Sequence, residues 1–115
     1  MAYDEELADR LRELIGGEAD LSEQRMFGGL AFLINGHIAV GVSGRGGLMA
    51  RADPAKQEAL IEQGKAEPMV MRGRDVSGFV RVPTEHVKTK RELAAWVKRG
   101  VTQARLVPPK PKRKR

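Results

Sequence analysis

The sequence has 115 residues, of which 41% are hydrophobic and 4% aromatic, and it carries a formal net charge of +6. A chain of this size forms one domain with a modest core of aliphatic side chains. The absence of cysteine excludes disulfides, thiolate metal sites and cysteine nucleophiles. No run approaches the ~18 apolar residues of a membrane span, and the acidic start lacks a signal-peptide pattern. These features predict a cytoplasmic protein without a membrane segment.

The positive charge is concentrated in the last eight residues. They hold no acid and five cations, Lys110, Lys112, Arg113, Lys114 and Arg115. The rest of the chain holds 16 basic and 15 acidic residues, which argues against a globular surface for duplex DNA. We expect a folded domain over residues 1–107 and a disordered basic tail over residues 108–115.

The first predicted element is a helix over residues 4–15. Asp4 can cap it, Leu7, Leu11 and Leu14 form one apolar stripe, and two glycines follow at its end. A strand is predicted over residues 21–27, with Glu23 and Arg25 on one face as an ion pair.

The central prediction is a β-hairpin over residues 28–42. Two apolar runs flank Asn35 and Gly36, a pair that favours the positive φ angles of a type I′ turn. Gly28 and Gly29 permit a bend into this hairpin. A fourth strand is expected over residues 48–52, so that the first half of the chain forms a meander.

The second half begins with a helix that Asp53 caps, with Pro54 at its first position and Gly64 after its end. Ala55, Ala59 and Leu60 are expected to face inward. Short strands are predicted over residues 69–71 and 78–82. The last helix follows a capping box of Thr89 and Glu92, and its apolar stripe consists of Leu93, Trp96, Val97, Gly100, Val101 and Ala104.

This order of elements predicts an α+β fold of two layers, in which three helices pack on one antiparallel sheet of six strands. Trp96, the sole tryptophan, is expected to be a major core side chain, and Gly100 to permit close packing of the last helix. A two-layer fold leaves one sheet face uncovered, which makes that face the expected docking surface.

No motif in the sequence indicates a catalytic, cofactor or metal site. The glycine-rich segment 41–47 lacks the ending of a P-loop and is best interpreted as a hairpin loop. His37 and His86 have no neighbouring ligand set, and His37 is expected to be exposed. Met26, Met49, Met69 and Met71 are interpreted as core filling, with a partner groove between helix and sheet as the alternative.

Several residues in order match one known family. Arg25, Met26, Phe27, Gly28 and Gly29, followed by Phe32, Gly36, Pro68-Met69, Gly73-Arg74 and Ala95-Trp96-Val97, resemble the N-terminal domain of the TfoX/Sxy family. The resemblance covers roughly residues 1–108 and suggests a short stand-alone member. It implies a fold similar to the secretion-chaperone-like and YjbR-like folds, an architectural role for the Arg25–Gly29 motif, and no catalytic residues. Full-length members are similar to regulators of natural competence that act with a cyclic-AMP receptor protein at promoters.

The leading hypothesis is a non-enzymatic interaction module, linked to transcription or competence, that binds a protein partner or a second copy of itself. Its basic tail would contact nucleic acid without sequence specificity. One alternative is a small-molecule or catalytic domain with a pocket near Arg25, His37 and Arg45. Another is direct nucleic-acid binding by cations around the last helix, such as Lys88, Lys90, Arg91, Lys98 and Arg99, which Glu85 and Glu92 dilute.

Overall fold

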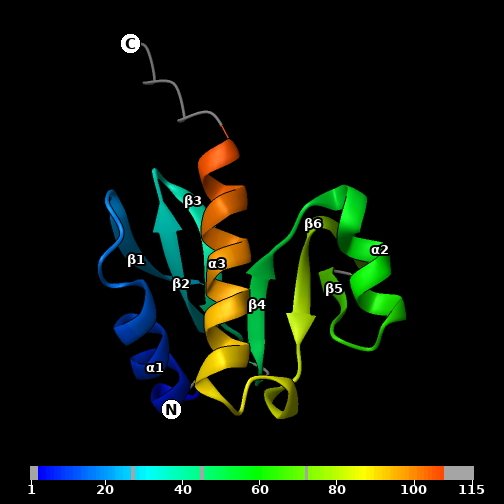
Figure 1. The fold of residues 1–115 in the computed structure, drawn as a ribbon, viewed down its shortest axis with the longest axis horizontal. Helices are drawn as coiled ribbons and strands as arrows, with labels where there is room; N and C mark the ends of the chain where they lie inside the picture. Colours follow the sequence, from blue (N-terminus) through cyan, green and yellow to red (C-terminus); the bar gives the residue numbers. More distant parts are fainter. Residues whose placement is uncertain (1–2, 27, 45, 72, 108–115) are drawn as a thin grey trace.

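The chain folds into three helices packed on one face of a six-stranded antiparallel sheet (Figure 1). The computed structural model describes residues 3–26, 28–44, 46–71 and 73–107. The strands follow the order β1-β2-β3-β4-β6-β5, so the first four form a meander and β6 inserts beside β4. The predicted α+β class and order of elements are confirmed. Residues 108–115, the predicted tail, lie outside the described residues.

Helix α1 covers Glu5–Ile15 and begins as its sequence predicts. Asp4 caps it by accepting a hydrogen bond from the Leu7 backbone nitrogen at 3.1 Å. Leu7, Leu11 and Ile15 are buried, and Gly16 follows the last turn. The stripe therefore anchors α1 on the sheet, beside α3.

The central hairpin consists of β2 (Gly29–Ile34) and β3 (His37–Val42). Asn35 and Gly36 have φ angles of 54° and 82°, as a type I′ turn requires, so the predicted turn is confirmed. All six residues of β2 are buried. The register shifts after Phe32, because Phe32 pairs with Val40 and Leu33 with Ile38. Ala39 is the extra residue of this bulge, and it lies in the main core.

The flanking elements agree with the prediction less closely. Strands β1 and β4 cover Leu21–Met26 and Leu48–Arg51, and helix α2 covers Pro54–Glu62 with Asp53 as its cap. Strand β5 covers Glu67–Met71, and β6 covers Arg74–Val82, four residues longer at its start than predicted. Pairing with β5 extends β6 through a segment that lacks alternating hydrophobicity, which is why the sequence pattern missed it.

The predicted inner face of α2 was wrong for two of its three residues. Ala55 and Ala59 are exposed, whereas Leu60, as predicted, is partly buried and packs on the core together with Ile61. A polar contact also fixes this helix, because Gln57 Oε1 accepts a hydrogen bond from the Gly78 backbone nitrogen at 2.9 Å. Alanine spacing alone did not reveal this polar attachment to β6.

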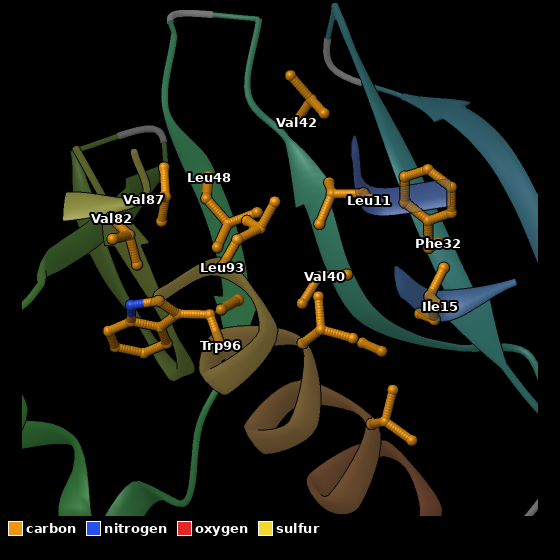
Figure 2. Close-up of a cluster of buried hydrophobic side chains, with 14 of the residues drawn as sticks. Leu11, Ile15, Phe32, Val40, Val42, Leu48, Val82, Val87, Leu93 and Trp96 are labelled. Atoms are coloured by element: carbon orange, nitrogen blue, oxygen red, sulfur yellow. The ribbon is translucent and has the colours of Figure 1, made fainter. Parts of the chain in front are cut away.

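Helix α3 covers Lys90–Leu106 and begins with the predicted capping box. A short 3₁₀ turn, Thr84–His86, leads into it. Its stripe packs across β3 and β4 (Figure 2), with Leu93 and Trp96 beside Leu48 and Val82. Trp96 is only 4% exposed, so the prediction that it belongs to the core is confirmed.

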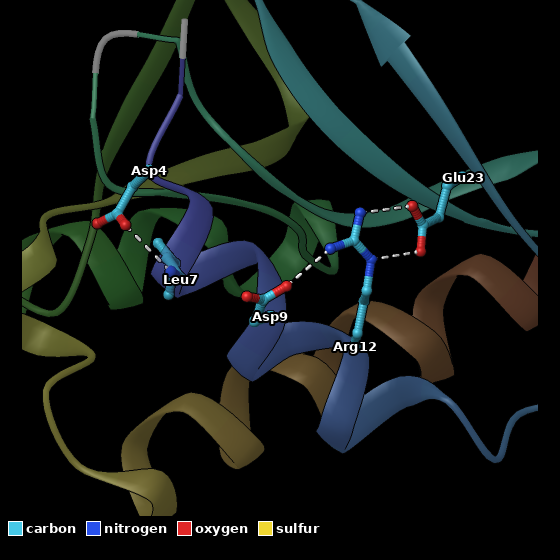
Figure 3. Close-up of polar contacts among 5 residues, drawn as sticks. All are labelled: Asp4, Leu7, Asp9, Arg12 and Glu23. Carbon is cyan, nitrogen blue, oxygen red and sulfur yellow. Dashed lines mark hydrogen bonds and ion pairs between the residues drawn. The ribbon is translucent and has the colours of Figure 1, made fainter. Parts of the chain in front are cut away.

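Glu23 does not pair with Arg25, as had been expected from their shared strand face. It forms two hydrogen bonds with Arg12 of α1, at 2.9 Å and 3.0 Å, and Arg12 also binds Asp9 (Figure 3). A helix packed over the sheet brings a guanidinium closer than a neighbour two residues along the strand. The Arg12 contact lowers the pKa of Glu23.

Glu23→Gln is expected to lower the free energy of unfolding slightly at neutral pH and less at acidic pH. The folded-state pKa of Glu23 is below its unfolded value. The pair therefore stabilises the fold above the unfolded pKa, and this contribution is lost as the pH falls through the folded pKa. Both side chains are partly exposed, so the effect is modest. Urea unfolding at pH 7 and pH 3 measures it.

Glu13→Gln is the matched control. The Glu13 carboxylate lies 3.8 Å from Lys90 Nζ, and both side chains are about three-quarters exposed. We expect a smaller change at both pH values. An equal change in the two variants at pH 7 would contradict a specific contribution from the pair of Arg12 and Glu23.

Candidate functional site

The structure does not bring together Arg25 and His37, two of the three residues of the predicted pocket. Arg25 is exposed on β1 opposite Leu30, whereas His37 is half-buried at the start of β3 opposite Ile34. Leu30 and Ile34 are four positions apart on β2, which is about 13 Å along the strand. Arg45 lies outside the described residues. His37 is also less exposed than expected, because its register places it on the helix side of the hairpin.

Two glycines of the family motif lie where the backbone geometry favours glycine. Gly28 has a φ of 76°, which few other residues adopt. Gly29 begins β2, where an added Cβ would lie 2.1 Å from the Val42 carbonyl oxygen. Phe27 lies outside the described residues. Met26 ends β1 with its side chain half-buried, and Arg25 lies beside it on the opposite face.

The sheet surface opposite the helices, which we call the far face, is largely apolar. All six strands contribute to it, and its apolar side chains pack as a cluster separate from the main core: Met26, Ala31, Leu33, Ile38, Met49, Met69 and Phe79. Met49 is buried in this cluster, which agrees with the expectation of core filling, whereas Met26 and Met69 are only partly buried on the far face. Ala31, Leu33 and Met49 are buried, and the other four are partly exposed.

Gly41 forms the floor of the far face. A Cβ at this position would lie 2.9 Å from Met49 Cε, because the Met49 side chain lies across the glycine. A small hollow of about 60 Å³ is lined in part by Met26, Met49, Met69 and Arg81. Methionine is flexible and fits irregular apolar partners, so this surface can adapt to a bound side chain.

Arg51 is the unusual charge of the far face. Its Nε donates a hydrogen bond to the Ile38 carbonyl oxygen at 2.6 Å, and its guanidinium lies 4.6 Å from the centre of the Phe79 ring. Partial burial lowers its pKa. No carboxylate in the described part of the chain forms an ion pair with it. Arg81, by contrast, pairs with Glu67 at 3.4 Å on the neighbouring strand.

Within the described residues, no three His, Cys, Asp or Glu side chains are grouped so that they could hold a metal ion. The two histidines lie apart, His37 on β3 and His86 in the 3₁₀ turn before α3. Among the same residues no helix is long and apolar enough to cross a membrane.

The family model of the TfoX N-terminal domain matches residues 13–104. The chain belongs to this family. The match runs from the last turn of α1 into the last turn of α3 and includes the whole sheet, so the far face and the helix side with α2 and α3 are parts of the TfoX N-terminal domain. A search of curated proteins finds no significant match.

The predicted two-layer fold leaves one sheet face uncovered, but the sequence pattern does not assign Arg51 or the methionines to that face. A signal was present in β4, where Leu48 and Ala50 alternate with Met49 and Arg51. This alternation assigns Met49 and Arg51 to one face. Their contacts with Gly41 and Phe79 depend on β3 and β6, and short-range patterns do not predict that pairing.

Proposed function

We propose that this TfoX N-terminal domain is a non-enzymatic interaction module, and that the far face binds a protein partner. The observation that carries the proposal is the apolar, methionine-rich surface on the side of the sheet without helices. Contiguous apolar surface of this kind marks interaction sites in soluble domains. Family membership supports a transcription-linked accessory role, which we include in the proposal.

Arg51 indicates the chemistry of the partner. The guanidinium of Arg51 is partly buried and has therefore lost part of its hydration. In return it makes one hydrogen bond to a backbone carbonyl oxygen and one contact with an aromatic ring, and it has no carboxylate partner among the described residues. A partner carboxylate would form a charge-assisted, bidentate pair with it. We therefore expect a partner segment in which an Asp or Glu lies among Leu, Met or Phe side chains.

Selection from a random peptide-display library provides a defined probe. We expect the selected peptides to contain an acid flanked by apolar residues and to shift the NMR signals of Leu33, Met49 and Phe79. Arg51→Gln is expected to weaken binding of such a peptide about tenfold or more, since a hydrogen bond to a charged group contributes ~1.5–3 kcal/mol.

Arg25→Gln is the matched control, because Arg25 is exposed on the other face of the sheet. It is expected to leave peptide affinity unchanged. Peptides that map to the helix side, or equal losses in both variants, would overturn the proposal. Light scattering at high concentration tests the related proposal of a homodimer through the far face.

A further inference from the structure

A groove on the helix side of the molecule collects cations from two helices. It lies between α2 and α3, has a volume of about 470 Å³, and is lined in part by Lys56, Lys98 and Arg99. A second hollow of about 260 Å³ continues along α3 and adds Lys65 and Arg91. Both hollows include Ala95 and Arg99, so they form one continuous depression. We call it the basic groove, defined by Lys56, Lys65, Arg91, Lys98 and Arg99.

The acids in the basic groove are already engaged. Asp53 accepts a hydrogen bond from the Ala55 nitrogen at 3.0 Å, and Glu92 accepts hydrogen bonds from the nitrogen and hydroxyl of Thr89. The positive ends of α2 and α3 partly balance these two carboxylates. No ion pair among the described residues includes any of the five cations. The groove therefore has an excess of positive charge.

Arg99 is held in place at the junction of the two hollows. Its guanidinium lies 4.7 Å from the centre of the Trp96 ring, and Trp96 is fixed in the core. A guanidinium held flat on a ring keeps its N–H donors in a planar fork that suits phosphate oxygens. Thr102 and Gln103 add uncharged polar groups to the lining.

Two of the cations are spaced along α3. Arg91, Ala95, Arg99 and Thr102 share one face of this helix, and Arg91 and Arg99 are about 12 Å apart along its axis. Such spacing suits several phosphates of one chain better than one isolated anion. The five cations of residues 110–115 follow α3 in sequence and include no acid. A polyanion with charges repeated along its length could pair with the cations of the groove and with the cations of residues 110–115.

We propose that the basic groove binds the phosphates of a single nucleic-acid strand running along α3. The near-neutral charge of the folded part hides an uneven distribution, because α3 holds five cations and one acid whereas α1 holds four acids and two cations. Recognition is independent of base sequence, since the nearest aromatic ring, Trp96, is buried and covered by Arg99. The groove and the far face lie on opposite sides of the sheet, so both can be occupied together.

Fluorescence anisotropy with a labelled single-stranded DNA of about 20 nucleotides tests this proposal. The full chain and a chain ending at Val107 are each measured with and without Lys98→Glu/Arg99→Glu. In both lengths the double variant is expected to weaken binding about tenfold or more. It should also reduce the slope of log affinity against log salt by about 1.4, since each phosphate contact contributes ~0.7 for a single strand. Lys56→Glu tests the wall of the groove formed by α2, and it leaves the contact between Arg99 and Trp96 unchanged.

Arg25→Glu/Arg74→Glu is the charge-matched control, because both arginines are exposed outside the groove. It is expected to change affinity less than threefold. Equal losses in the two double variants would overturn the proposal, as would efficient competition by inorganic phosphate or by polyglutamate at the same ionic strength. Circular dichroism of each variant confirms the fold. The far-face experiment is independent of these results, because it depends on residues of the other face.

Discussion

Trp96→Ala is expected to lower the free energy of unfolding by about 3–5 kcal/mol, the range found when a buried tryptophan is truncated. Trp96 is 4% exposed and lies among side chains that join α3 to the sheet, including Leu48, Val82 and Leu93 (Figure 2). Alanine would leave a cavity at this junction and remove the ring that supports Arg99. The loss is a large part of the ~5–15 kcal/mol that stabilises an ordinary domain.

Urea unfolding followed by far-ultraviolet circular dichroism measures this effect without the tryptophan signal. Trp96→Phe keeps an aromatic face and most of the apolar volume, so it should lose less stability than alanine. Leu106→Ala is the control on the same helix, because Leu106 is 70% exposed and its truncation should change stability little. Equal effects at positions 96 and 106 would contradict the role of Trp96 in the core.

Local sequence signals predicted those elements whose ends are fixed by backbone chemistry. The pair Asn35-Gly36 determines the turn of the central hairpin, and Thr89 with Glu92 determines the start of α3. Both the turn preference and the capping box are set by residues within a four-residue segment, so they can be predicted without knowledge of any tertiary contact. The start of β6 and the orientation of α2 depend on β5 and Gln57 instead. The start of β6 was not predicted, and the orientation of α2 was predicted only for Leu60.

The candidate sites were harder to predict than the fold, because each depends on residues far apart in the chain. Arg51 meets Phe79 only after β6 inserts beside β4. Lys56 and Arg99 come together only when α2 and α3 lie on the same side of the sheet. Net charge could not reveal the basic groove, since an acidic α1 offsets a basic α3 in the sum. The pocket predicted from Arg25 and His37 failed for the same reason, because strand register separates them.

Gly100→Ala is expected to destabilise the protein by about 1–3 kcal/mol, the usual cost of overpacking, although alanine is the better helix former by ~1 kcal/mol. Gly100 lies where α3 crosses the bulge in β3. An added Cβ would lie 2.3 Å from the Ala39 carbonyl oxygen and 2.8 Å from Val40 Cγ1. The oxygen belongs to the backbone of a central strand, so it cannot move aside as a flexible side chain would.

Gly17→Ala is the matched control for this substitution. It makes the same chemical change at an exposed position after α1, where an added Cβ has no neighbour within 4 Å. It should leave the urea midpoint nearly unchanged, whereas Gly100→Ala lowers it. A stabilised Gly100→Ala protein would mean that helix propensity outweighs the contact, and that α3 can move away from β3. The basic groove would then be adjustable in width, because α3 forms one of its walls.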